Sequence, residues 1–141
     1  MLETINYTLD EPHCMPSRMH FKDAGLNLVA KTDVFVPAGC SILVDTGVHF
    51  EVPEDCFGKI EPNPILLQNY DVVSMGTVVN PGDVDSIKVK LYNFGTKGCR
   101  IPHGSNVAQI VFQECKSPCL NLVPKLRESS RGDAKFVIEV V

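Results

Sequence analysis

Short extended runs separated by turn residues fill most of this chain. The runs are rich in Val, Leu, Ile and Phe, as β-strands are, and glycine or proline stands between them, as in Pro37-Ala38-Gly39. The predicted strands are residues 7–9, 26–30, 33–36, 41–44, 48–52, 58–61, 76–79, 87–93, 100–101 and 107–113. So many short strands in one domain predict an all-β fold of the sandwich, jelly-roll or closed-barrel type.

The stretch from residue 57 to residue 95 carries the clearest local pattern and is predicted to form two strands around a hairpin. In its last strand, apolar Ile87, Val89 and Leu91 alternate with polar Lys88 and Lys90. A period of two predicts a strand with one buried face. Helical periodicity is weak throughout, and only residues 64–69 predict a short helix or turn.

The length of 141 residues predicts one domain with a single core. Residues 125–133 are charged and polar, which is typical of a mobile linker, and an apolar end follows at residues 135–141. We therefore predict a β domain at residues 1–126 and a flexible C-terminal arm at residues 127–141. The apolar end is expected to be buried as a strand added to the same or a neighbouring subunit.

Charge and hydropathy argue against two classes of partner. The formal net charge of -4 lacks the basic character of nucleic-acid-binding proteins, so no nucleic acid is expected. No apolar stretch approaches about 18 residues, and the N-terminus lacks a basic region followed by an apolar run, so neither a membrane span nor a signal peptide is expected. These features predict an intracellular protein, cytoplasmic or nuclear.

The cysteines and histidines do not form a metal or catalytic pattern. Six cysteines without a secretion signal are expected to stay reduced. Cys115 and Cys119 form a close pair, but a zinc site needs two more ligands and no second pair lies at finger spacing, so no metal site is expected. The four histidines are scattered along the sequence.

Several segments, in this order and spacing, resemble the trimeric dUTP pyrophosphatase (dUTPase) family over about residues 23–136. They are Asp23-Ala24-Gly25-Leu26-Asn27-Leu28, Val44-Asp45-Thr46-Gly47-Val48, Phe57-Gly58-Lys59-Ile60 and Gly104-Ser105-Asn106-Val107-Ala108-Gln109-Ile110. The resemblance implies a distorted jelly roll of the β-clip type and a homotrimer with three clefts at the subunit boundaries. An unrelated intracellular β-sandwich is the alternative that fold-level patterns alone leave open.

The chain departs from the family at the positions that do the chemistry. The family's Pro-Arg-Ser, whose Arg and Ser grip phosphates, is here Pro62-Asn63-Pro64. The Asp that activates the attacking water aligns with Asn80, and the Tyr that stacks beneath the deoxyribose aligns with Asp83. An amide cannot act as a general base, and loss of a general base costs about a hundred- to ten-thousand-fold in rate, or roughly 3 to 5.5 kcal/mol.

The first, fourth and fifth motifs are altered as well. Asn27 replaces the first-motif Asp, Ser105-Asn106 replaces the fourth-motif Asp-Arg, and Gln109 is the best-preserved polar position. Arg131 and Phe136 remain from the glycine-rich arm that closes over the triphosphate. The β-branched residues after Phe136 do not permit the close backbone approach that glycine allows.

The resemblance therefore predicts a dUTPase-like protein that has lost dUTP hydrolysis and serves as an interaction module. Altered sites of this kind occur in family members of DNA viruses, which suggests a viral origin and host-cell partners. The alternative is an active dUTP diphosphatase in which Asp83 or Asp85 takes over as the base and Lys59 or Lys135 contacts phosphates. Its rearranged groups would all need correct placement, since a 1 Å error costs about a hundredfold.

Partner and cofactor expectations follow from the same residues. The changes at Asn63, Pro64, Asn80 and Asp83 argue against dUTP binding. No cofactor is expected. Mg²⁺ is expected only if the chain is an active dUTP diphosphatase. A protein partner would bind through the cleft or through the C-terminal tail, whose last residues fit a groove that captures a free carboxylate, as in strand addition by PDZ domains.

Overall fold

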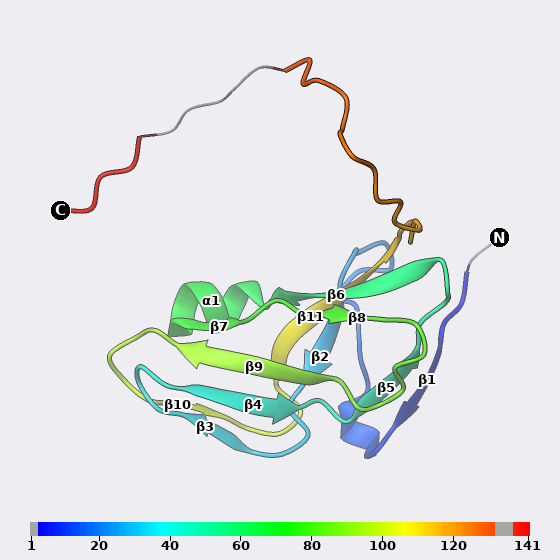
Figure 1. Cartoon of the computed structure of the whole chain (residues 1–141). Coiled ribbons are helices and arrows are strands. Elements are labelled where there is room, and N and C mark those ends of the chain that lie inside the picture. Colours follow the sequence, from blue (N-terminus) through cyan, green and yellow to red (C-terminus); the bar gives the residue numbers. More distant parts are fainter. Residues whose placement is uncertain (1–2, 132–136) are drawn as a thin grey trace.

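Strands make up almost all of the regular structure in the computed structural model, which describes residues 3–131 and 137–141 (Figure 1). The elements follow one another as β1 (Asn6–Leu9), a 3₁₀ turn η1 (Pro12–Cys14), β2 (Leu26–Val29), β3 (Val34–Val36), β4 (Ser41–Asp45), β5 (Val48–Glu51), β6 (Cys56–Pro62), α1 (Pro64–Tyr70), β7 (Val72–Ser74), β8 (Val78–Val79), β9 (Lys88–Asn93), β10 (Cys99–Ile101) and β11 (Asn106–Glu114). The predicted all-β class is confirmed. The strand predictions match observed strands, and β7 is the one that the sequence pattern did not reveal.

The strands form one large, one medium and two small antiparallel sheets. The largest has the order β2-β11-β6-β8, the next has the order β4-β9-β7, and two pairs join β1 to β5 and β10 to β3. The β4-β9-β7 sheet and the β3-β10 pair form one layer, and the largest sheet forms another behind it (Figure 1). The fold therefore encloses its core between layers, as a sandwich-type architecture requires.

The predicted hairpin within residues 57–95 is wrong. Strand β6 pairs with β8, whereas β9 pairs with β4 and β7, so the strands of this stretch belong to two different sheets. After β6 the chain passes through α1, adds β7 to the β4-β9-β7 sheet and returns to pair β8 with β6. The sequence pattern predicted β6, β8 and β9 but not their partners, because pairing depends on contacts far apart in the sequence.

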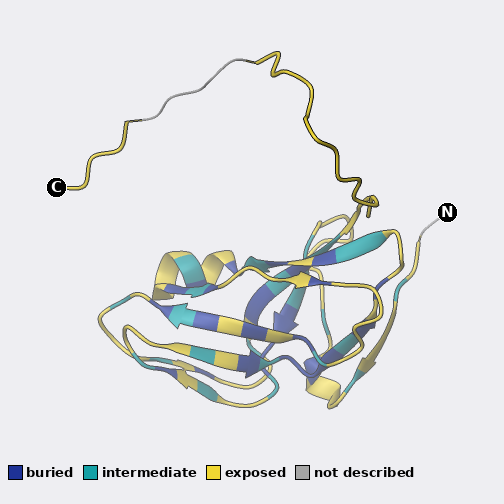
Figure 2. Ribbon diagram, in the orientation of Figure 1, coloured by how far each residue is buried: buried dark blue, intermediate teal, exposed yellow. Residues whose placement is uncertain are grey.

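Apolar side chains from every sheet meet in one core. Figure 2 shows the buried residues along the strands in dark blue. Its largest fully buried members include Phe50, Leu28, Ile60, Leu91 and Ile110. In β9 the residues alternate between exposed Lys88 and Lys90 and buried Val89 and Leu91, which confirms the predicted period of two.

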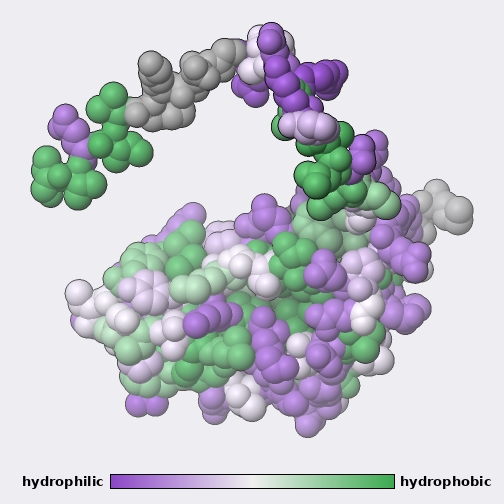
Figure 3. Space-filling model, viewed as in Figure 1, coloured by the Kyte–Doolittle hydropathy of each residue, from purple (hydrophilic) through white to green (hydrophobic). Residues whose placement is uncertain are grey.

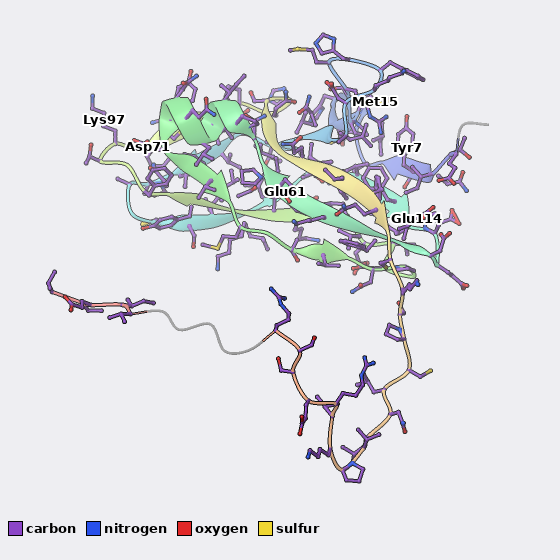
Figure 4. All side chains as sticks on the ribbon, turned by 90° about the horizontal axis from the view of Figure 1, so that it is seen from above. Tyr7, Met15, Glu61, Asp71, Lys97 and Glu114 are labelled. Atoms are coloured by element: carbon purple, nitrogen blue, oxygen red, sulfur yellow. The ribbon has the colours of Figure 1, made fainter. Side chains whose placement is uncertain are left out.

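The compact part of the chain ends with β11 at Glu114. Residues 115–131 and 137–141 are exposed and contain no helix or strand. In Figure 4, Glu114 marks the place where this tail leaves the body. The domain boundary at residue 126 stays a prediction. Among the described residues, no helix has both the length and the apolar character needed to cross a membrane.

Candidate nucleotide-binding cleft

Three of the motif segments meet where β2, β11 and β6 lie side by side. Gln109 of β11 pairs with Asn27 of β2 on one side and with Glu61 of β6 on the other. Its side-chain Nε2 donates a hydrogen bond to the carbonyl oxygen of Pro62 at 3.1 Å. The side chain also covers Gly25, where any Cβ would overlap it. A side chain at position 25 would therefore displace the end of the Gln109 side chain, and the segments of the first, second and fourth motifs lie next to one another.

Asn63 is the N-cap residue of α1, and its side chain is used for this cap. Its Oδ1 accepts hydrogen bonds from the backbone N–H groups of Ile65, at 3.0 Å, and Leu66, at 3.1 Å, and so caps the N-terminus of α1. The residue is only 7% exposed. Pro64 follows at the first helical position, where its missing N–H has no intrahelical partner to lose. Asn and Pro are among the preferred residues at these two positions, so this pair builds a helix start.

Asn80, Asp83 and Asp85 lie in the loop between β8 and β9. All three are exposed. The N–H of Asp83 donates to the carbonyl oxygen of Asn80 at 3.3 Å, and Oδ1 of Asp83 accepts from the N–H of Asp85 at 3.2 Å. Asp83 is thus used in a local turn. With Lys88 and neighbouring residues, the two aspartates line a shallow cavity of about 240 Å³.

Within one chain, this loop lies far from Asn63 and Gln109. Val79 pairs with Gly58, and because β8 is antiparallel to β6, the chain after Val79 runs away from Pro62. The four steps along the strand from Gly58 to Pro62 span about 13 Å at roughly 3.3 Å per residue. The structure therefore brings Asn27, Asn63 and Gln109 together but leaves Asn80, Asp83 and Asp85 at the other end of β6.

The remaining candidate residues are placed as follows. Lys59 forms an ion pair with Glu61 at 2.9 Å, so this candidate phosphate ligand already has an anionic partner. Pro64 is exposed at the helix start, and Arg131 is exposed in the tail, where its N–H donates to Oγ of Ser129 at 3.3 Å. The candidates Lys135 and Phe136 lie outside the described residues.

The described residues do not build a magnesium site. Among them, no group of three or more His, Cys, Asp or Glu side chains is placed to hold a metal ion. Asn27 offers an uncharged amide oxygen where the family resemblance implies a carboxylate, and hard cations such as Mg²⁺ favour carboxylates. That Mg²⁺ is bound only if the chain hydrolyses dUTP stays a prediction.

Histidines that are scattered in the sequence meet in the structure. The rings of His13 and His103 lie edge to face, with centroids 5.0 Å apart, and Nδ1 of His103 contacts Oδ1 of Asp33 at 2.8 Å. His49 contacts both Asp10 and the loop between β8 and β9. These partners are 35 to 90 residues from one another along the chain, so the sequence carries no local signal for them.

Comparisons with known proteins give the same assignment as the motifs. A dUTPase family model matches residues 11–137. The chain is 31% identical over 126 residues to a deoxyuridine 5'-triphosphate nucleotidohydrolase of fowl adenovirus A serotype 1, covering 89% of this chain and 71% of that protein. It is 30% identical over 133 residues to the protein of the same name from Crocosphaera subtropica, covering 91% of this chain and 92% of the relative.

A solved structure matches the fold over nearly the whole chain. A mutant dUTPase of Staphylococcus bacteriophage 80alpha with dUpNHpp superposes with a TM-score of 0.88 at 19% identity, covering 96% of this chain and 97% of the phage chain. The strand arrangement, the converging motif segments and the family match over residues 11–137 agree, and the chain belongs to the dUTPase family.

Proposed function

We propose that this member of the dUTPase family does not hydrolyse dUTP efficiently and uses its β scaffold as an interaction module. The observation that carries the proposal is the role of Asn63. At the position where the resemblance places a phosphate-gripping Arg, the chain has a buried amide that caps α1. The cap leaves no cation at this position, and bidentate phosphate recognition depends on one.

The proposal is also supported by Asn80. A carboxylate at this position would take a proton from the attacking water, and an amide has no such basicity. Asp83 and Asp85 stand nearby in sequence, but the Asp83 carboxylate accepts a hydrogen bond inside its own loop. Losing the phosphate cation and the general base together is expected to reduce turnover by more than either loss alone.

An active dUTP diphosphatase with rearranged residues is the second candidate. The names of the relatives, deoxyuridine 5'-triphosphate nucleotidohydrolases at about 30% identity, favour it over the first candidate. The cavity that Asp83 and Asp85 share with Lys88 offers a carboxylate and a cation side by side. In this candidate Asp83 or Asp85 would be the base, and Mg²⁺ would accompany the nucleotide.

Turnover of dUTP distinguishes the two candidates. We expect the purified chain with dUTP and Mg²⁺ to release pyrophosphate at less than about 0.1 per second, because a typical enzyme turns over at about 10 per second and loss of a base costs at least about a hundredfold. The relative from Paramecium bursaria Chlorella virus 1, 29% identical over 128 residues, serves as the matched comparison under the same conditions. Calorimetric titration with a non-hydrolysable dUTP analogue then separates a nucleotide-binding protein from one that binds no nucleotide.

We further propose a homotrimer. One chain leaves the Asn63 and Gln109 region and the Asn80 loop at opposite ends of β6, so a cleft containing both needs a second copy. Light scattering is expected to give three times the chain mass of 15.5 kDa. A monomer mass at micromolar concentration would show that the two regions do not form one site.

The C-terminal tail is the segment that we propose for a protein partner. Three of its apolar side chains are almost fully exposed in the isolated chain: Leu120 is 97%, Leu122 99% and Val140 96% exposed. Figure 3 shows hydrophobic stretches along the extended tail. Apolar residues in an extended segment suit strand addition to a sheet edge, in a neighbouring subunit or in another protein. Action inside a host cell, in the cytoplasm or nucleus, belongs to the same proposal.

A further inference from the structure

The loop between β8 and β9, residues 80–86, is attached to the body mainly at its two ends. Before it, Val79 pairs with Gly58 of β6. After it, the N–H of Ile87 donates to the carbonyl oxygen of Val48 at 2.9 Å. The hydrogen bonds of Asp83 described above stay inside the loop. The middle of the loop therefore needs another attachment if it is to keep one conformation.

His49 provides that attachment. Its Nδ1 lies 2.7 Å from the carbonyl oxygen of Val84, and its Nε2 lies 2.8 Å from Oδ1 of Asp10. Within the part of the chain that the structure describes, the only other hydrogen bond from residues 80–86 to a residue outside them joins Ser86 to Lys88. His49 thus connects the loop to Asp10, which follows β1 and lies 39 residues before His49 in the sequence.

Both partners of the His49 ring are hydrogen-bond acceptors. A backbone carbonyl and an ionised carboxylate have no proton to donate, so each ring nitrogen must carry its own proton. A neutral imidazole carries one N–H, whereas the imidazolium carries two. We propose that His49 acts as a charged clasp, a positioning residue whose imidazolium holds the loop of Asn80 and Asp83 against Asp10.

The charges around His49 favour its protonated form. Asp10 also accepts a hydrogen bond from Nζ of Lys31 at 3.0 Å, and this bond, followed by the one from His49, lowers the pKa of Asp10. Asp10 therefore stays ionised. The hydrogen bond to the Val84 carbonyl, and then the one to Asp10, raise the pKa of His49 above its usual 6.5, and Asp45 adds to the effect. In the opposite direction, partial burial lowers the pKa of His49. Lys31 is a cation that shares Asp10 with His49.

Loss of the proton releases the loop and not the Asp10 contact. A neutral His49 has one N–H for two acceptors, and a hydrogen bond to a carboxylate is stronger than one to a neutral carbonyl. The Val84 carbonyl therefore loses its donor. Because the folded-state pKa is raised, the clasp is complete below about pH 6.5 and is lost as pH rises through the raised pKa.

This inference is independent of whether dUTP is hydrolysed. The clasp fixes the loop that bears two of the altered positions, Asn80 and Asp83, and it would do so in a silent protein as in an active one. The test of the clasp and the test of dUTP hydrolysis can therefore fail separately. The clasp can be absent from an inactive protein, and it can be present in an active one. A pH-dependent loop would give the cleft two states, one closed at mildly acidic pH and one open at alkaline pH.

Hydrogen exchange of the full-length chain, corrected for the intrinsic effect of pH, tests the clasp. Between about pH 6 and about pH 8.5, protection of a peptide covering residues 80–87 is expected to fall about five- to tenfold, the effect of one hydrogen bond. In His49→Gln, whose amide has one donating and one accepting end, the same peptide is expected to exchange fast at both pH values. His20→Gln is the matched control, because His20 is exposed and its ring makes no hydrogen bond among the described residues.

A second measurement on the wild type alone guards against misfolding of the variant. The NMR titration of the His49 ring is expected to give a pKa above 6.5, with the amide signal of Asp85 following the same curve. Equal exchange of wild type and His49→Gln at about pH 6 would overturn the clasp. So would a His49 pKa at or below 6.5, or loop signals that do not move with it.

Discussion

Replacing Asn93 by Leu is expected to lower the free energy of unfolding by about 3 to 5 kcal/mol. Asn93 ends β9 and is fully buried. Its Nδ2 donates to the carbonyl oxygens of Val36, at 3.0 Å, and Lys97, at 2.8 Å, and its Oδ1 accepts from the N–H of Gly95 at 2.9 Å. Leucine has a similar size but leaves three backbone groups without partners, and each costs about 1 to 3 kcal/mol when buried.

Urea denaturation at one fixed protein concentration measures this loss, because assembly of copies would otherwise change the apparent stability. Asn69→Leu is the matched control, since Asn69 is exposed on α1 and the same replacement is expected to change stability by less than about 0.5 kcal/mol. A loss below about 1 kcal/mol for Asn93→Leu would mean that Asn93 does not join β9 to β3 and to the turn before β10.

Gly47→Ala is expected to cost about 3 to 4 kcal/mol, the second large effect on stability. The backbone of Gly47 has φ +66°, a left-handed conformation that costs a residue with a Cβ about 1 to 2 kcal/mol. A Cβ at Gly47 would also overlap Sγ of Cys14, which is only 1% exposed and has little room to move. Overlap of this kind adds about 1 to 3 kcal/mol.

Gly39→Ala separates the two causes. Gly39 has φ +72°, but a Cβ there would meet nothing within 4 Å. It is therefore expected to cost only the conformational part, about 1 to 2 kcal/mol, in the same urea measurement. Equal losses for the two variants would show that Cys14 moves aside without cost. Gly47 belongs to the Thr-Gly turn of the family resemblance, so this pair tests whether the preserved frame is required for folding.

The sequence contained most of the secondary structure. Alternation predicted β9 with its buried face, and residues 64–69 predicted the place of α1, because both signals are local. The sequence did not reveal β7, a three-residue strand that follows α1 directly and is too short to show a period. Nor did it reveal that β6 and β9 lie in different sheets, because pairing is decided by burial of whole faces.

The cleft was less predictable than the strands. Motif resemblance identified Asn63 as a missing cation, whereas its role as a helix cap follows from the Asn-Pro start of α1, a signal already present in the sequence. The contacts of His49 with Asp10 and Val84 had no such signal. Its partners lie 39 and 35 residues away, so only the folded chain shows that its ring has acceptors on both sides.

In this dUTPase-family chain, the strands and glycines that build the cleft resemble the family more closely than the side chains at the motif positions do. Gly25, Gly47 and the strand pairs around Gln109 still build the frame. Asn63 caps a helix. In our proposal, Asn80 occupies the position at which the family resemblance implies a general base. Our proposal requires a stable fold whose cleft lacks the phosphate-binding cation and the general base.

The most direct measurement of that proposal is a single-turnover reaction with the wild-type chain in excess over radiolabelled dUTP and with Mg²⁺ present. Excess protein removes product release as a limit and reports the chemical step alone. We expect conversion of dUTP to dUMP slower than about 0.1 per second, at least about a hundredfold below a typical enzyme turnover of about 10 per second. Conversion at about 1 per second or faster would contradict the proposal and make the chain an active dUTP diphosphatase with a rearranged site.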